Sequence, residues 1–555
     1  MAPRRIALLL SVLLITAGPT APQSLEASVP ALPGAAPDSA RSDVQLLWDR
    51  DRWAAAIQAL YAARGNAPLW FNGRHASTAA QAFLEEIPHL EERGLQSRDY
   101  DPASLRALVA AAERSGQPAD IARADRALST IAARLVSDLQ RGRVTPKQVG
   151  YSLDLHAQRF DAAEAVRTLA DSARVSSTLD ALEPQLRHYA LLKTALGRYR
   201  QLARHPELTV LPPLPRRAVH RGEPYQGAAA LRRLLIALGD LPETSTSTSA
   251  VLDSITAEGL SHFQKRMSLT PDGVLGRATY RALTVPLAQR AQQIVLSLER
   301  VRWLPRTLDA PPIIVNIPQF RLFAFRTPRD AARDILQMDV IVGATFEGRE
   351  TPVFAADMTY VVLNPYWDVP ASILKQELLP HLQVESDWAE RNGYEIVAGP
   401  GDDAQVVPAT PENIARLAAG KLRLRQVPGP ENALGRVKFM LPNQHNVYLH
   451  DTPTQALFKE NRRAFSHGCI RVADPMALLA HVLRNEPGWN AERMAAALAG
   501  PPATRIVLTH PIPVFIVYGT ALATEAGDTL FFDDIYLQDA KLTRLLLRTR
   551  APSRS

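Results

Sequence analysis

Cysteine is almost absent from this sequence, because its 555 residues include a single one, Cys469. One cysteine cannot form an internal disulfide, which excludes the disulfide-built scaffolds of many small secreted proteins. Long apolar runs are also scarce, and beyond the N-terminal region none approaches the ~20 residues that a membrane-spanning helix needs. The net charge of +7 is spread along the chain without a basic block. This charge suits an anionic polymer or surface as partner, and without a recognised nucleic-acid motif we expect no nucleic-acid partner.

The first residues have the features of a secretory signal. Arg4 and Arg5 form a basic start, and residues 6–17 form an apolar run of signal-peptide length. We therefore predict a signal peptide over residues 1–21, followed by a flexible tether rich in Pro, Ala and Ser over residues 22–43. An uncleaved membrane anchor is the alternative. In an exported protein an odd thiol is expected to be reactive.

Composition and apolar spacing predict a helical region in the first part of the chain. With 46% hydrophobic and 21% charged residues the chain is able to bury several cores, and its length indicates two to four domains. Trp53, Ile57 and Tyr61 recur at helical spacing, and this periodicity continues for about 150 residues. We predict a helical scaffold domain over residues 44–220, without a catalytic cluster, whose main helices cover residues 78–93, 102–115, 119–142, 160–173 and 178–204.

A shorter segment, residues 221–290, carries a different pattern. In GLSHFQKRMSLTPDGVLGRATYRAL, Phe263 and Gln264 lie on a helical pattern, whereas Asp272 and Gly273 predict a turn. A second glycine turn precedes another predicted helix. This arrangement resembles the small three-helix peptidoglycan-binding domain, and the resemblance implies a contact with glycan or peptide stems. The alternative is a generic helical hairpin.

The C-terminal half has the pattern of a β-rich domain. From about Pro311 the period changes to two and β-branched residues concentrate, as in PIIVNI, MDVIVG and VFIVYG. Many short strands predict a β-rich, sandwich-like domain at residues 305–540, so the chain as a whole is multidomain α+β. Its middle, residues 371–436, instead has helical patterns and a Pro/Gly stretch. We interpret it as a helical insertion and expect it to form a lid over a nearby site.

The single thiol lies in FSHGCIRV, which follows HNVYLHD by a short interval. Alternation along a strand places Asn446, Tyr448 and His450 on one face and the intervening Val and Leu on the other. Cys469 follows His450 by 469 − 450 = 19 residues, which is enough for a loop and a neighbouring strand. A cysteine becomes a strong nucleophile when a neighbouring base or cation stabilises its thiolate. Cys469 is therefore the candidate nucleophile, and His450 is the candidate base that activates it.

The residues around the thiol add two further expectations. Gly468 allows close backbone approach, so the N–H groups of Gly468 and Cys469 are candidates to stabilise an oxyanion. Arg471 follows Cys469 by two residues and shares its face if the strand has begun. A guanidinium in that position is suited to hold a substrate carboxylate.

Three other interpretations of this region were weighed. His445, His450, His467 and Cys469 are zinc-ligand types, but alternation separates His445 from His450 and the spacing matches no usual zinc finger, so we expect no metal. A buried, inert cysteine would need apolar neighbours, whereas this one has His, Gly, Ser and Arg beside it. Papain-like proteases also pair Cys with His, but in the reverse order along the chain.

HDT…SHGCIRV resembles the active-site signature of L,D-transpeptidases, in which a His precedes [S/T]-x-G-C-x-R. The segments DVIVG (339–343), TPVF (351–354), NPYWDVP (364–370) and PVFIVYGTA…DDIYLQD (513–539) extend the likeness to the large periplasmic members of that family. YAARGNAPLWF (61–71) resembles their scaffold. The resemblance implies a periplasmic protein with scaffold, peptidoglycan-binding and lidded catalytic domains.

The resemblance also implies roles for individual residues. Cys469 is the nucleophile, and both the strand argument and the family motif favour His450 over His467 as the base. The position before Gly468 is His here, where large members also have Ser, so the choice between the two histidines stays open at this stage. The expected orienting residues are Tyr448, Ser466, His467 and Gly468, and the expected substrate-binding residues are Arg471, Trp367, Tyr366 and Asn446.

The implied reaction is acyl transfer between peptide stems of peptidoglycan, with a tetrapeptide donor, a stem amine as acceptor and no cofactor. A cysteine thioester forms, D-Ala leaves, and a 3→3 cross-link results. Water, a free D-amino acid or a protein amine as acceptor would instead give carboxypeptidase, exchange or anchoring activity. A wall-binding protein without enzymatic activity is the non-enzyme alternative. Other cell-wall enzymes are conceivable partners, and the oligomeric state is left open.

Two cations near the thiol lead to an expectation about its resting state. His450 and Arg471 both favour a thiolate, whereas burial under a lid disfavours both charges of a thiolate–imidazolium pair. We expect the cations to prevail, so that Cys469 and His450 rest as an ion pair.

Overall fold

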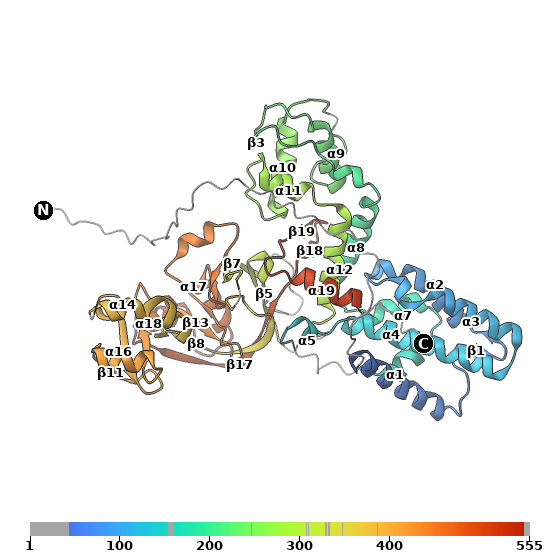
Figure 1. Cartoon of the computed structure of the whole chain (residues 1–555), viewed down its shortest axis with the longest axis horizontal. Helices are drawn as coiled ribbons and strands as arrows, with labels where there is room; N and C mark the ends of the chain where they lie inside the picture. Colours follow the sequence, from blue (N-terminus) through green and yellow to red (C-terminus); the bar gives the residue numbers. More distant parts are fainter. Residues whose placement is uncertain are drawn as a thin grey trace. The chain divides into compact units, whose positions relative to one another are not determined.

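The computed structural model describes residues 44–548 except 154–159, 246, 307, 309, 328–329, 331–333, 347 and 386 (Figure 1). The predicted signal peptide and tether lie outside the described residues. The chain divides into two compact units, Met1–Asp49 and Arg50–Ser555, and of the first only the start of helix α1 (Val44–Ala63) is described. Within the described part, no helix combines the length and the apolar character needed to cross a bilayer.

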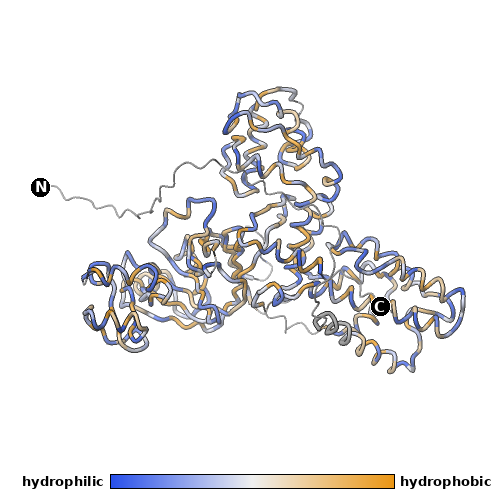
Figure 2. The backbone as a smooth tube through the Cα atoms, viewed as in Figure 1, coloured by the Kyte–Doolittle hydropathy of each residue, from blue (hydrophilic) through white to orange (hydrophobic). Residues whose placement is uncertain are grey.

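The predicted helical region is helical in the structure. Its helices are α2 (Thr78–Glu86), η1 (Ile87–Arg93), α3 (Pro102–Ser115), α4 (Pro118–Arg141), α5 (Pro146–Val149), α6 (Ala162–Ala170), α7 (Val175–Leu182) and α8 (Arg187–Leu202), with short 3₁₀ turns η2 (Ser97–Tyr100) and η3 (Pro206–Thr209) and a small hairpin of β1 (Phe71–Asn72) and β2 (His75–Ala76). Apolar and polar segments alternate along these helices, as expected for amphipathic helices packed on a core (Figure 2).

Two of the predicted helices are interrupted, and proline accounts for both interruptions. The helix predicted over residues 78–93 changes to a 3₁₀ helix at Ile87, directly before Pro88. The helix predicted over residues 178–204 is split, because Glu183 is extended with ψ 162° and precedes Pro184. A residue before proline is disfavoured in the helical region of backbone space, so α7 ends there and α8 starts anew.

The segment predicted at residues 221–290 contains three helices, α9 (Ala228–Leu238), α10 (Ser254–Arg266) and α11 (Arg277–Leu283), and a short ribbon of β3 (Ala218–Val219) with β4 (Leu275–Gly276). The buried Gln264 amide joins these elements, since it donates to Asp272 at 2.8 Å and to Thr279 at 3.0 Å and accepts from the Gly273 N–H at 2.8 Å. Gly273 has φ +66°, where a Cβ would meet the Ala257 carbonyl oxygen at 2.8 Å. The signature residues therefore hold this fold together.

Helix α12 (Leu287–Val301) connects the helical regions to the β-rich domain. Leu298 packs in the core that α8 shares with the three-helix segment, whereas Leu296 packs in the core of the β-rich domain. Glu299 accepts from the Val144 N–H at 3.0 Å, and Arg300 pairs with Asp539 of α19 (Gln538–Arg548) at 2.5 Å. The charge of Arg300 is thus neutralised by a partner from a distant part of the chain.

The C-terminal domain contains a nine-stranded sheet with the order β15-β7-β16-β14-β13-β8-β17-β5-β6. Because β7 also pairs with β6, the sheet closes on itself. The prediction of a β-rich domain is confirmed, but the strands form one closed, barrel-like sheet rather than two facing sheets. Its strands are β5 (Ile313–Asn316), β6 (Arg321–Ala324), β7 (Leu336–Gly343), β8 (Phe354–Leu363), β13 (Val437–Met440), β14 (Leu449–His450), β15 (Ala464–Ser466), β16 (Ile470–Val472) and β17 (Thr504–Val517).

Smaller elements complete this domain. They are the turn helices η4 (Ile317–Gln319) and η7 (Gln455–Lys459), the helices α17 (Pro475–Leu483) and α18 (Ala491–Leu498), and a hairpin of β18 (Ala521–Ala523) and β19 (Thr529–Phe531). Leu478 and Leu479 of α17 are buried in the same core as the inward-facing side chains of the sheet.

The insertion at residues 371–436 has its own small core, but it is not purely helical as predicted. Strands β11 (Gln405–Val407), β10 (Tyr394–Ala398) and β12 (Arg423–Gln426) form a sheet that continues to β9 (Trp367–Asp368) outside the insertion. These strands are short and β12 carries two arginines, so their sequence shows little alternation. The helices are α13 (Ala371–Ile373), the π-helix η6 (Leu374–Leu378), α14 (Leu379–Val384), α15 (Trp388–Arg391) and α16 (Pro411–Ala418).

Candidate active site

Parallel pairing of β14 with β16 places the two sequence motifs next to each other. Leu449 lies opposite Ile470 and His450 lies opposite Arg471. Leu449 and Ile470 are fully buried in the core, so the residues on either side of them face away from it. The other face of this strand pair therefore presents Tyr448 and His450 beside Cys469 and Arg471.

Asn446 does not belong to that strand face. Strand β14 covers only Leu449–His450, and Asn446 lies in a turn with φ +53°. Its side chain is exposed, but its backbone carbonyl is 3.8 Å from the sulfur of Cys469 and accepts the thiol hydrogen. The alternation that predicted a shared face ends before this residue, although the residue still lies beside the thiol.

Ser466 organises the turn that carries the thiol. Its buried hydroxyl donates to the carbonyl of Cys469 at 2.5 Å and accepts the N–H of Gly468 at 3.2 Å. Gly468 has φ +117°, which side-chain-bearing residues rarely adopt, and its carbonyl accepts the hydroxyl of the buried Thr351 at 2.8 Å. Ser466 and Thr351 thus fix the turn from both sides. Thr351 was not singled out from the sequence, because nothing in TPVF signals this contact.

His450 is buried and neutral. Its Nδ1–H donates to the backbone carbonyl of Asp451 at 2.6 Å, so Nε2 keeps its lone pair. Burial lowers the pKa of His450 to about 3, and the nearby positive charge of Arg471 acts in the same direction. An imidazole in this state is able to accept a proton and does not carry a resting positive charge.

The thiol of Cys469 is also neutral at rest. Burial raises its pKa above the ordinary thiol value, although Tyr448, Lys438 and Arg471 all oppose this shift. Both shifts act against a thiolate–imidazolium pair and so oppose the expectation of a resting ion pair. The physical reason is that burial, which we expected the cations to outweigh, is the largest contribution for both groups.

Two cations of the site have no anionic partner among the described residues. Arg471 makes no ion pair there, and its buried Nε has no hydrogen-bond partner. Lys438 lies opposite His450 in the β13–β14 pairing, and its Nζ is 4.2 Å from the centre of the Tyr448 ring. Sequence reasoning missed Lys438, because only the strand register brings it to this face.

Aromatic residues border the thiol on the side of β9. Tyr448 acts to lower the pKa of the Cys469 thiol, and Trp367 of β9 acts to lower the pKa of Tyr448. The Tyr448 ring also meets the His450 ring edge to face, with centroids 5.7 Å apart. Tyr366 instead lies under the guanidinium of Arg425 in the insertion, 4.0 Å from its ring centre.

His467 contacts the insertion. Its exposed ring lies 2.8 Å from a carboxylate oxygen of Glu377 in η6, and Arg349 pairs with the same carboxylate at 3.1 Å. The residue directly before Gly468 is therefore held by the start of the insertion. His450, by contrast, lies on the strand next to the thiol-bearing turn.

The histidines of the considered zinc set have separate partners. His445 contacts the Ser152 hydroxyl at 3.0 Å, whereas His450 and His467 interact with Asp451 and Glu377. Across the described ranges, no three His, Cys, Asp or Glu side chains gather as a potential metal site.

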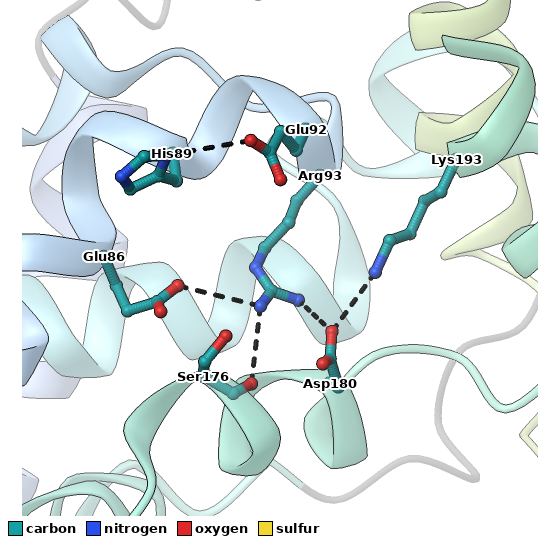
Figure 3. Close-up of a pocket in the computed structure, with 7 residues that line it drawn as sticks. All are labelled: Glu86, His89, Glu92, Arg93, Ser176, Asp180 and Lys193. Carbon is teal, nitrogen blue, oxygen red and sulfur yellow. Dashed lines mark hydrogen bonds and ion pairs between the residues drawn. The ribbon is translucent and has the colours of Figure 1, made fainter. Parts of the chain in front are cut away.

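A cavity of about 210 Å³ lies elsewhere, among the scaffold helices and α8 (Figure 3). Arg93 pairs there with Asp180 at 2.6 Å and with Glu183 at 3.0 Å, and Lys193 pairs with Glu183 at 2.5 Å. Figure 3 shows the side chains of Arg93, Asp180 and Lys193 directed toward one another. The remaining lining residues are Glu86, His89, Glu92 and Ser176.

Comparisons with known proteins agree with this architecture. Residues 55–196 match the family described as "Scaffold domain", residues 225–283 match "Putative peptidoglycan binding domain", and residues 311–507 match "L,D-transpeptidase catalytic domain". A protein of Haemophilus influenzae named "Putative L,D-transpeptidase" is 32% identical over 280 residues, which cover 50% of this chain and 55% of the relative. The match thus spans about half the length of that relative. Cys469 and His450 fall within the segment that matches the L,D-transpeptidase catalytic domain, so residues 311–507 are identified as a domain of that family.

Proposed function

We propose that this protein is a periplasmic peptidoglycan L,D-transpeptidase that joins peptide stems by 3→3 cross-links through a thioester on Cys469. The observation that carries the proposal is the placement of the chain's single thiol beside a neutral imidazole and two cations that form no ion pair with any residue that the structure describes. A nucleophile, a proton acceptor and positive charge are the components that acyl transfer needs.

In the acylation step, His450 acts as general base. The Nδ1–H bond to the Asp451 carbonyl leaves Nε2 as the acceptor of the thiol proton. The sulfur attacks the carbonyl of the third stem residue, forming a C–S bond while the C–N bond to D-Ala breaks. The imidazolium formed in the attack returns the proton to the leaving amine of D-Ala.

In the second step an amine of a neighbouring stem attacks the thioester. His450 accepts a proton from that amine, a C–N bond forms, the C–S bond breaks, and the thiol recovers the proton. Water in place of the amine would give a carboxypeptidase, and a free D-amino acid or a protein amine would give exchange or anchoring. All four outcomes share the same acyl-enzyme.

The oxyanion of each tetrahedral intermediate needs donors close to the sulfur. The Gly468 N–H is already bonded to Ser466, but no hydrogen bond of the described residues occupies the N–H of Cys469. We therefore assign the Cys469 N–H as the main backbone donor. In this scheme Ser466 and Gly468 act by shaping the turn, and the Tyr448 hydroxyl orients the sulfur.

Substrate binding is assigned to the groups that border this face. The unpaired guanidinium of Arg471 holds a stem carboxylate, because a buried cation without a partner is stabilised by an anionic ligand. Trp367 forms a wall of the groove beside Tyr448. Tyr366 supports the insertion through Arg425, and Asn446 offers an exposed amide next to the thiol.

The insertion at residues 371–436 is proposed to act as a lid. Its Glu377 contacts both His467, two residues before Cys469, and Arg349, so this carboxylate attaches the insertion to the active-site turn. These side chains are partly exposed, and such ion pairs are weak enough to break when a polymer enters. The three-helix segment is proposed to bind the glycan or peptide of the wall, and the scaffold to hold both domains.

The test is incubation of the purified protein with tetrapeptide-bearing muropeptides, followed by mass spectrometry of the products. A dimer that has lost one D-Ala supports the cross-linking proposal, whereas a tripeptide monomer indicates carboxypeptidase activity. The Cys469→Ala variant is expected to fold and to form neither product, because it removes only the thiol. Binding without any product in the unmodified protein would support the wall-binding alternative, and dimers formed by Cys469→Ala would refute the mechanism.

A further inference from the structure

Lys438 occupies a position in the active site that neither the motif nor the proposed chemistry explains. It lies on β13, directly opposite His450, so its side chain emerges on the face that carries the thiol. Its Nζ is 4.2 Å from the centre of the Tyr448 ring, within the range of a cation–π contact. The residue is half-buried, and among the described residues it forms no ion pair.

The charged and titratable groups around Lys438 come from several elements. Asp368 on β9 and Asp402 in the insertion are the acids whose charges act on Lys438, and the Asp368 carboxylate already pairs with Arg423. Burial lowers the pKa of Lys438, which shows that this ammonium is held where charge is costly. Tyr448 lies against its ammonium, His450 lies opposite it on β14, and the charge of Cys469 acts on it from the turn before β16, while Arg471 lies beyond His450 on the next strand.

We infer that Lys438 is a positioning residue of this site, whose ammonium holds the Tyr448 ring against the thiol and places a permanent positive charge beside the sulfur. A neutral His450 supplies no charge to the resting site, so the charge that favours the thiolate comes from Lys438 and Arg471. Arg471 is assigned to a substrate carboxylate in the proposed function. Once substrate neutralises Arg471, Lys438 is the cation that remains for the sulfur.

A purely structural role for Lys438 would predict something different. The aliphatic stem of a lysine fills space next to an aromatic ring, and a methionine of similar length fills nearly the same space. Lys438→Met therefore keeps most of the packing and removes the charge. Lys438→Arg keeps the charge and changes the shape, so the two variants separate the roles of charge and packing.

The experiment measures alkylation of the full-length protein by iodoacetamide as a function of pH, with Cys469 as the only cysteine to react. The charge of Lys438 acts to lower the pKa of Cys469, and a close opposite charge changes the pKa of an acidic group by about 1–3 units, so Lys438→Met is expected to move the alkylation midpoint upward by about one pH unit. Lys438→Arg is expected to restore the midpoint of the unmodified protein. Lys193→Met, which removes a lysine of the scaffold ion network, is the matched control and is expected to leave the midpoint unchanged.

An unchanged midpoint in Lys438→Met would overturn the inference, as would an equal shift in Lys438→Arg. If Lys438→Met does not give the circular dichroism spectrum of the unmodified protein, Lys438→Gln carries the same prediction. The inference rests on the proposed function only in taking Cys469 as the nucleophile. Alkylation measures the reactivity of the thiol and does not require the cross-linking reaction. If Lys438→Met lost cross-linking activity but kept the alkylation midpoint of the unmodified protein, the result would contradict the inferred role of Lys438 and not the proposed reaction.

Discussion

The scaffold cavity and the active site both contain buried or half-buried cations, but only those of the cavity have anionic partners among the described residues. Arg93 and Lys193 in the cavity wall are paired with Asp180 and Glu183. In the active site, by contrast, Arg471 and Lys438 have no anionic partner among the described residues. Removing one member of a buried pair leaves an uncompensated charge, whereas an unpaired buried cation already lacks a partner in the resting protein.

This difference teaches how to separate structural charge from functional charge. A cation that the fold has neutralised contributes to the packing of helices and offers little to a ligand. Some cations are destabilised by burial and have no anionic partner in the fold. Such a cation is expected to be stabilised by an anionic ligand or by the negative charge that develops during a reaction. The cations that line the scaffold cavity are already paired, so the cations beside the thiol are the ones available for chemistry.

The largest effect is expected from the base of the active site. His450→Ala removes the only neutral imidazole on the strand next to Cys469, and general base catalysis contributes about 10²- to 10⁴-fold to a rate. We expect a loss of cross-linking rate in this range with little change in stability, measured by product mass spectrometry and thermal unfolding. His467→Ala is the matched control, and a larger loss in that variant would assign the base role to His467.

A pair of arginine variants tests the comparison itself. Arg93→Met leaves the buried Glu183 carboxylate with less compensation, so it is expected to lower the free energy of unfolding by about 3–5 kcal/mol while the folded enzyme keeps its kcat/KM. Arg471→Met is expected to change stability little and to lower kcat/KM by about 10- to 100-fold, because a hydrogen bond to a charged group contributes about 1.5–3 kcal/mol. Denaturant unfolding and steady-state kinetics measure the two quantities. Equal stability losses in both variants would remove the distinction.

The third prediction concerns the pH dependence of alkylation at Cys469, the nucleophile of the active site. The pKa of Cys469 is raised by burial, so the reactive thiolate becomes more abundant only as pH rises toward and through that value. Alkylation is therefore expected to increase by about tenfold per pH unit through the neutral range, without a plateau at acidic pH. His450→Ala is expected to keep this shape, because the imidazole is already uncharged. An acidic plateau that disappears in His450→Ala would restore the resting ion pair that the structure contradicts.

The smallest effect concerns the contact between the insertion and the active-site turn. Glu377→Gln removes the charge that holds His467 and Arg349, and exposed ion pairs contribute about 0.2–1 kcal/mol. Access to the thiol is therefore expected to rise by up to about fivefold, measured with a bulky neutral alkylating reagent at fixed pH. Glu385→Gln, which affects an ion pair with Arg391 within the insertion, is the matched control. No difference between the two variants would show that Glu377 does not restrain the insertion.

Local patterns in the sequence were sufficient for the elements that depend on local physics. Helices α3 and α4 lie where apolar spacing predicted them. The helix predicted over residues 178–204 is instead split at Pro184, because the residue before proline is disfavoured in a helical backbone, a local rule that the apolar spacing did not take into account. Alternation before His450 and the presence of Arg471 after Cys469 indicated which residues would share a face. The domain boundaries and the roles of the site residues stay predictions.

Tertiary structure decided the properties that depend on partners distant in the sequence. The closure of the sheet depends on the pairing of β6 with β7, and the strands of the insertion carry too little alternation to be recognised alone. Lys438 faces the active site because of the register between β13 and β14. A register shift of one residue would have placed its side chain on the opposite face of the sheet. Above all, the sequence by itself determined the single thiol, a candidate imidazole and the guanidinium of Arg471. Burial decided their resting charges, because desolvation depends on every atom that the fold packs around them.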